Sequence, residues 1–155
     1  MKENYLISIL GRQIVNGEQE EIEVTTFGQY SEKNGKRYIM YREYEDTQPP
    51  QKGRTSTLKI EDGCVTLLRS GGDETRLVLE RGKRHLCRYD TGFGAMTVGV
   101  YTHQLKNELG ETGGKLSVRY TLDVNSALAS VNEIIVTVRE AGAEKKETTQ
   151  NTEEQ

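Results

Sequence analysis

The stretch of the chain that decides the fold is KLSVRYTLDV, residues 115–124. Its apolar and aromatic side chains fall on every second position, at Leu116, Val118, Tyr120, Leu122 and Val124. The positions between them carry polar or charged side chains. Successive side chains of a β-strand point to opposite faces, whereas a helix with about 3.6 residues per turn would scatter the two sets. The pattern therefore predicts a strand with one apolar face and one wet face.

The same alternation returns along the chain, and turn signals separate its occurrences. It recurs at residues 22–26, 96–102 and 134–138. Shorter β-rich runs occupy residues 5–10, 37–45, 55–60, 64–69, 75–79 and 84–89. Dipeptides that favour hairpin turns lie between runs, at Asn34–Gly35, Asp62–Gly63, Gly71–Gly72 and Gly82–Lys83. We therefore expect consecutive strands to pair antiparallel with their neighbours.

These runs predict an all-β fold of about eight to ten strands. That number is more than a single open twisted sheet usually contains. A sandwich or a closed barrel resolves this, and the short links favour an antiparallel up-and-down barrel. Two stretches break the alternation, residues 104–110 and 126–131. In the first, Leu105 and Leu109 are four positions apart, so each stretch is a candidate for one helical turn.

Composition predicts a single domain with a polar tail. The chain has 155 residues, and we assign residues 1–140 to one β-barrel domain. Residues 141–155 contain no large apolar side chain, so we expect them to be disordered. The net charge of −3 gives no overall positive field for nucleic acid. Without a signal peptide or a long apolar run, we expect a cytoplasmic protein that does not enter a membrane.

Several short motifs resemble the YwiB-like family of small uncharacterised bacterial proteins. They comprise residues 89–96, residues 114–120, Asn132 ahead of Ile134, Tyr38, Tyr41 and Glu43 on the third strand, and Arg69–Ser70–Gly71. The resemblance covers roughly residues 3–140. It implies a calycin-like, lipocalin-like antiparallel β-barrel. It implies no activity, because members are known chiefly as domains of unknown function.

The sequence offers no catalytic, cofactor or metal site. His85, His103, Cys64 and Cys87 lack the close spacing of metal ligands, and we interpret both cysteines as reduced core residues. No strand-turn-helix elbow such as GxSxG presents a nucleophile. Residues 92–94, Gly-Phe-Gly, resemble a phosphate loop but lack the following helix, so a strand kink is the better interpretation.

Charge is unevenly distributed along the chain. Residues 18–46 hold eight acidic and four basic side chains. Residues 69–88 hold six basic side chains, namely Arg69, Arg76, Arg81, Lys83, Arg84 and Arg88, against three acidic ones. Pairing of charges across neighbouring strands explains this pattern, and a basic patch for a partner or RNA is the alternative.

Three ionisable residues interrupt or close apolar strands: Arg42, Glu43 and Arg69. A charged side chain that points into a barrel must be paired, because burying it alone costs several kcal/mol. We therefore expect Tyr41, Glu43, Arg69 and Tyr89 to converge at one mouth of the barrel. There they either bind a small polar-headed ligand or close the end as a structural plug.

Two functions follow from these expectations. One is a binding module that holds a small molecule in the barrel lumen. The other is a non-catalytic scaffold that acts through its outer surface or as a homodimer. We do not expect an enzyme, because the residues supply no acid, base and nucleophile set.

Overall fold

The computed structural model describes residues 5–44, 53–71, 74–90 and 94–141. Within them the chain forms ten strands: β1 (Tyr5–Val15), β2 (Glu18–Lys33), β3 (Lys36–Tyr44), β4 (Gly53–Glu61), β5 (Cys64–Ser70), β6 (Thr75–Glu80), β7 (Arg84–Asp90), β8 (Ala95–Gly110), β9 (Gly113–Val124) and β10 (Ala127–Glu140). Each pairs antiparallel with its neighbours in sequence, and β1 also pairs with β10. The predicted closed up-and-down barrel is confirmed.

The end of the chain is described only in part. Ala141, the first residue of the predicted tail, is buried. The rest of that tail, residues 142–155, lies outside the described residues, as do residues 92 and 93 of the predicted strand kink.

Hairpin turns join the strands where residues tolerate a left-handed backbone. Asn34 and Gly35 both have positive φ, at 55° and 78°. This is the geometry of the two-residue turn that the dipeptide predicts. The β9–β10 turn uses Asn125 and Ser126, with φ of 51° and 70°, which carry no glycine and were not recognised from the sequence.

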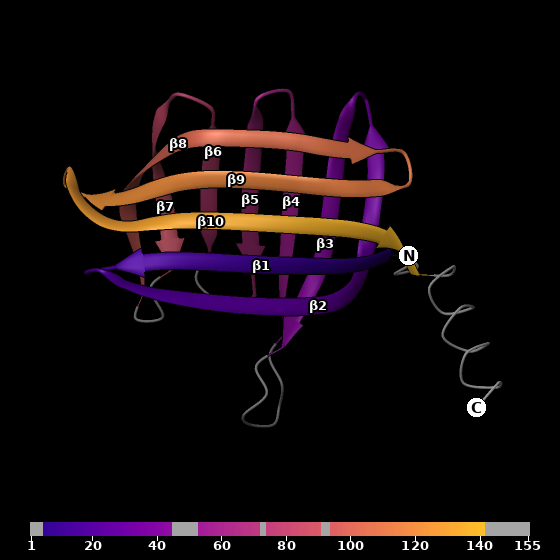
Figure 1. The fold of residues 1–155 in the computed structure, drawn as a ribbon, viewed down its shortest axis with the longest axis horizontal. Helices are drawn as coiled ribbons and strands as arrows, with labels where there is room; N and C mark the ends of the chain where they lie inside the picture. Colours follow the sequence, from indigo (N-terminus) through magenta and orange to yellow (C-terminus); the bar gives the residue numbers. More distant parts are fainter. Residues whose placement is uncertain (1–4, 45–52, 72–73, 91–93, 142–155) are drawn as a thin grey trace.

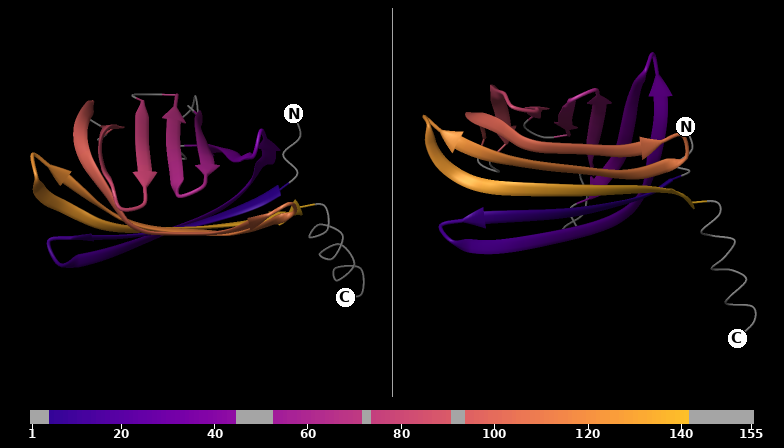
Figure 2. Two further views of the ribbon diagram at one scale, coloured as in Figure 1. Left: turned by 90° about the horizontal axis from the view of Figure 1, so that it is seen from above. Right: turned by 45° about the horizontal axis from the view of Figure 1, so that its top comes forward.

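The barrel is flattened into two layers whose strands run crosswise (Figure 1). β9, β10 and β1 lie in the front layer, and β4 to β7 lie behind them (Figures 1 and 2). β2 and β8, with 16 residues each, are the longest strands of the described chain. The β1–β2 and β9–β10 hairpins extend beyond the back layer (Figure 2).

The two predicted helical turns are wrong. Residues 104–110 belong to β8, and residues 127–131 belong to β10. The register of β8 with β9 shifts between Thr102 and Gln104, and that of β10 shifts between Leu128 and Ser130. Each shift is a bulge, which moves the inward-facing side chains from even to odd positions or interrupts their alternation. The bulge in β8 explains why Leu105 and Leu109 show a helix-like spacing in the sequence.

One end of the barrel is closed by a group of side chains around Tyr30. Its hydroxyl donates a hydrogen bond to the carbonyl oxygen of Gly110 at 2.6 Å. Arg37 donates to the same oxygen at 2.9 Å, and its guanidinium carbon lies 5.9 Å from the centre of the Tyr30 ring. The ring of Tyr5 packs edge-on against Tyr30. These contacts join β1, β2, β3 and β8, and we call this the closed end.

Gly28 allows β2 to pack closely inside the barrel. A Cβ atom there would overlap the Ile7 side chain and the carbonyl oxygen of Met40, which would lie 2.5 Å away. We therefore expect Gly28→Ala to destabilise the protein by about 1–3 kcal/mol in urea denaturation, the usual cost of overpacking. The control is Gly11→Ala in β1, where the nearest atom would lie 3.9 Å from the new Cβ. Equal unfolding midpoints for the two variants would contradict this assignment.

Candidate functional site

A cavity of about 370 Å³ lies at the opposite end of the barrel, which we call the open end. Its apolar surface comes from both layers: Ile9, Ile22, Val24, Ile134 and Val136 from the front, and Leu58 and Leu67 from the back. Ile22 faces this cavity although 67% of its surface is exposed. The overhanging hairpins therefore present apolar surface to solvent on the inner side of the barrel.

Polar residues enter this cavity because they occupy inward positions of β3, β4 and β5. Tyr41 is opposite Ser56, and Ser56 is opposite Arg69, so the three form one row across the back layer. Glu43 lies two positions beyond Tyr41 on the same face of β3. Alternation thus fixes which face these side chains take, and strand register brings them side by side.

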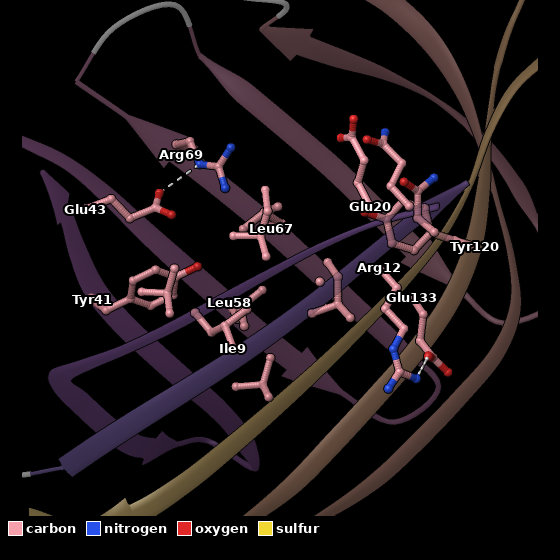
Figure 3. A pocket seen from close by; sticks show the side chains of 17 residues that line it. Ile9, Arg12, Glu20, Tyr41, Glu43, Leu58, Leu67, Arg69, Tyr120 and Glu133 are labelled. Atoms are coloured by element: carbon pink, nitrogen blue, oxygen red, sulfur yellow. Dashed lines mark hydrogen bonds and ion pairs between the residues drawn. The ribbon is translucent and has the colours of Figure 1, made fainter. Parts of the chain in front are cut away.

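An ion pair between Glu43 and Arg69 lies on the cavity wall (Figure 3). Arg69 Nε is 3.2 Å from Glu43 Oε2, and about two thirds of each side chain is buried. Ser56 links the two, since its hydroxyl donates to Glu43 Oε2 at 2.8 Å and lies 3.3 Å from Arg69 Nε, which donates to it. Because Ser56 is fully buried, this link lies inside the barrel wall and away from solvent.

Two buried tyrosines line the same cavity. Burial raises the pKa of Tyr41, and the negative charge of Glu43 raises it further. Burial also raises the pKa of Tyr120, with a smaller contribution from Tyr89. Arg69 acts in the opposite direction on both pKa values, which indicates that its charge reaches both hydroxyl groups. Both phenols therefore remain protonated at neutral pH.

The structure brings three of the four predicted site residues to the cavity wall. Tyr41, Glu43 and Arg69 line it, whereas Tyr89 packs against the core from β7 and is absent from the lining. Tyr89 is near enough to influence the pKa of Tyr120. Arg42, the other ionisable residue of β3, is exposed, because it alternates with the inward-facing Tyr41 and Glu43.

Sequence reasoning missed further polar residues of the cavity, namely Arg12 and Gln13 on β1, Glu20 on β2, Tyr120 on β9, and Asn132 and Glu133 on β10. In Figure 3 Glu20 lies on the side of the cavity away from Glu43. Gln13 and Glu20 lie in the overhanging hairpin, where polar residues occupy both faces and hide the alternation. Asn132 Nδ2 donates to Ser130 Oγ at 2.9 Å, and both residues are buried.

The cysteines and histidines do not form a metal site within the described part of the chain. No group of three or more His, Cys, Asp or Glu side chains there could hold a metal ion. Both cysteines are free; Cys87 is buried and accepts a hydrogen bond from the Val78 amide at 3.3 Å. Burial raises the pKa of both thiols. The Nε2 atom of His85 lies 2.9 Å from Oε1 of Glu80.

Much of the predicted basic segment is paired. Arg84 makes two hydrogen bonds to Asp123, at 2.9 and 2.7 Å, and Lys83 contacts Glu80 at 3.3 Å. Arg76 and Arg88 lie opposite each other as exposed neighbours on β6 and β7. Pairing thus explains part of the basic segment, with two arginines left side by side on the surface.

The family profile that matches the chain is described as a domain of unknown function, DUF1934, and the match runs over residues 7–136. The chain belongs to this family. The YwiB-like resemblance seen in its motifs is confirmed by a DUF1934 relative, the uncharacterized β-barrel protein YwiB of Bacillus subtilis (strain 168). The two are 26% identical over 140 residues, which is 88% of this chain and 95% of YwiB.

The fold of this DUF1934 chain is also that of a solved structure. The crystal structure of the YwiB protein from Bacillus subtilis matches it with a TM-score of 0.76 and 24% sequence identity. The match covers 90% of this chain and 94% of the other. The relationship therefore establishes the barrel and leaves its activity open.

The described residues include no helix that is long and apolar enough to pass through a membrane.

The Ser56 hydroxyl is the buried link of the polar wall. Ser56→Ala removes a donor to Glu43 and an acceptor for Arg69. We expect a loss of about 1–3 kcal/mol in the free energy of unfolding, the cost of leaving such groups unsatisfied. Ser117→Ala, at a half-buried position of β9, is the matched control and should change stability by less than about 0.5 kcal/mol. Indistinguishable denaturation curves would show that the link contributes nothing.

Tyr120 should make the protein sensitive to alkaline pH. Its pKa is raised in the folded state, so the stability that it contributes is complete below about pH 10, the pKa of an unfolded tyrosine, and is lost as the pH rises above it. We expect Tyr120→Phe to remove part of this alkaline loss. Urea denaturation followed by circular dichroism over a pH series measures it. The same pH dependence in both proteins would refute the expectation.

Proposed function

We propose that this chain is a non-catalytic binding protein that holds a small amphipathic molecule in the cavity at the open end of its barrel. The observation that carries the proposal is the difference between the two ends. The closed end is filled by Tyr30, Arg37 and Tyr5, whereas the open end keeps a cavity of about 370 Å³. That volume lies within the usual range of ligand pockets, about 300–1,000 Å³.

The cavity combines an apolar surface with a few convergent polar groups, as small-molecule sites do. Leu58, Leu67 and Val136 supply buried apolar surface, and Glu43 and Arg69 are confined to one wall. The apolar side chains of Ile22 and Val24 are left partly exposed on the inner face. Covering such surface with an apolar ligand gains about 25 cal/mol per Å².

A binding role is favoured over catalysis by the composition of the lining. Within the part of the chain that the structure describes, the residues that line the cavity include no histidine, cysteine or lysine. Its tyrosines hold their protons at neutral pH because burial raises their pKa values. The wall therefore supplies groups that bind and orient, and lacks an activated nucleophile with a base beside it.

The scaffold and homodimer roles have weaker support. Apart from Ile22, which faces the cavity, the most exposed large apolar side chains among the described residues are Leu86 and Leu128, at 70% and 66%. They lie on β7 and β10, which are not neighbouring strands. Single exposed leucines are normal on a protein surface and do not by themselves form an interface.

A neutral fluorescent probe, N-phenyl-1-naphthylamine, tests the proposed function. We expect saturable binding with one site per chain. Val24→Trp should fill part of the cavity and weaken binding by about tenfold or more, equivalent to about 1.4 kcal/mol. Glu23→Trp, which places the same indole on the opposite face of β2, should bind as the unmodified protein does.

The two variants also report on their own folding. The chain contains no tryptophan, so each introduced indole is a unique fluorophore whose emission follows unfolding. Absence of saturable binding by the unmodified protein would overturn the proposed function. Equal affinity of the Val24→Trp and Glu23→Trp variants for the probe would show that the probe binds outside this cavity. That result would also overturn the proposed function.

A further inference from the structure

The hydrogen-bonding groups of the cavity wall differ in how many partners they have. Glu43 Oε2 already has two partners, the hydroxyl of Ser56 at 2.8 Å and Arg69 Nε at 3.2 Å. Both partners are fixed by the register of adjacent strands. The carboxylate of Glu43 is therefore neutralised and held from within the wall, without help from a ligand.

Arg69 keeps unused donors. A guanidinium has five N–H groups, and the hydrogen bond that Arg69 makes to Ser56 uses the one on Nε. The ion pair with Glu43 is also closest at Nε. In Figure 3 the two terminal nitrogens of Arg69 point away from Glu43. They form the planar fork that matches the two oxygens of a carboxylate.

The neighbouring tyrosines are uncharged, and their hydroxyl groups can both donate and accept hydrogen bonds. The hydroxyls of Tyr41 and Tyr120 are protonated and lie within the influence of Arg69. Among the described residues of the lining, the other cation is Arg12, which is paired with Glu21 and Glu133, at 3.2 and 2.9 Å. Figure 3 shows the Arg12–Glu133 pair apart from Arg69. The Tyr41 oxygen accepts one hydrogen bond from Arg69, and a ligand oxygen would accept from the remaining N–H groups of the guanidinium.

The remaining charges limit how negative that acceptor can be. Glu43 is adjacent to Arg69, and Glu20 lines the same cavity without a recorded partner among the described residues. A dianionic phosphate would be repelled by both carboxylates, whereas a monoanion places one charge on one arginine. Next to Arg69, the apolar side chains of Leu58 and Leu67 provide surface for a hydrocarbon portion.

We propose that the ligand is an amphipathic carboxylate, whose two oxygens accept hydrogen bonds from the terminal nitrogens of Arg69 and whose hydrocarbon part lies against Leu58, Leu67 and Val24. This inference rests on the proposed function, because it names the ligand class of the same cavity. It assigns Arg69 as the residue that selects the head group, and the apolar residues as those that respond to chain length.

Displacement of N-phenyl-1-naphthylamine by three matched compounds tests the proposal. Decanoate, decanol and decylamine share one hydrocarbon chain and differ in the head group alone. We expect decanoate to displace the probe at a concentration about tenfold or more below that of decanol, as for a charge-assisted bidentate contact worth about 1.4 kcal/mol or more. Decylamine should be the weakest of the three, because its charge is that of Arg69.

Two variants link the preference to Arg69. Arg69→Lys keeps the charge beside Glu43 but loses the planar fork, so the decanoate-to-decanol ratio should fall by about tenfold while decanol is unaffected. Arg42→Lys, on the outer face of β3, is the matched control and should keep the ratio. Glu43→Gln removes the competing carboxylate and should keep or raise the ratio, so it tests the proposal even if Arg69→Lys does not fold.

The outcomes separate the two proposals. Equal displacement by decanoate and decanol, or no displacement by either while the probe still binds, would overturn the carboxylate and leave the proposed function standing. A preference for decanoate that survives in Arg69→Lys, or is lost in Glu43→Gln, would also overturn it. Failure of the probe to bind the unmodified protein overturns the proposed function itself.

Discussion

Closure of the antiparallel hydrogen-bond ladder is the constraint on which the rest of the structure depends. β1 pairs with both β2 and β10, so the first and last strands complete the ring. Because the ring is closed, inward-facing side chains of the described strands enter one shared interior, and none of these ten strands is an edge strand. Among the described strands, β6 and β7 share the fewest paired residues, and there Arg76 pairs with Arg88. There the Cys87 sulfur accepts the Val78 amide hydrogen in place of a backbone carbonyl.

The flattening of this closed ring makes its two ends unequal. At the closed end, Tyr30 and Arg37 bond to one carbonyl oxygen, that of Gly110, and fill the space between the layers. At the open end the β1–β2 and β9–β10 hairpins extend past the back layer (Figure 2). The inner face of that overhang has no opposite layer to pack against. Apolar residues such as Ile22 therefore stay exposed there, and a cavity remains.

The polar wall of the cavity is stable because its charges are paired before any ligand arrives. Glu43, Ser56 and Arg69 come from three consecutive strands and satisfy one another. A charge placed alone at this depth would cost several kcal/mol. Pairing through Nε leaves the terminal nitrogens of Arg69 directed away from Glu43, whose Oε2 has two partners. The wall is thus a stable structural element and a preorganised polar surface at once.

The sequence by itself determined the strands, their antiparallel order and the faces of Tyr41, Glu43 and Arg69, because hydrophobic alternation and turn dipeptides are local properties. The same reasoning failed at residues 104–110 and 126–131, where bulges shift the alternation and imitate helical spacing. Only the tertiary structure decided that Gln13 and Glu20 line the same cavity as Arg69 while Tyr89 does not line it. The physical reason is that closure, bulges and layer crossing set the distances between strands remote in sequence, and no local pattern encodes those distances.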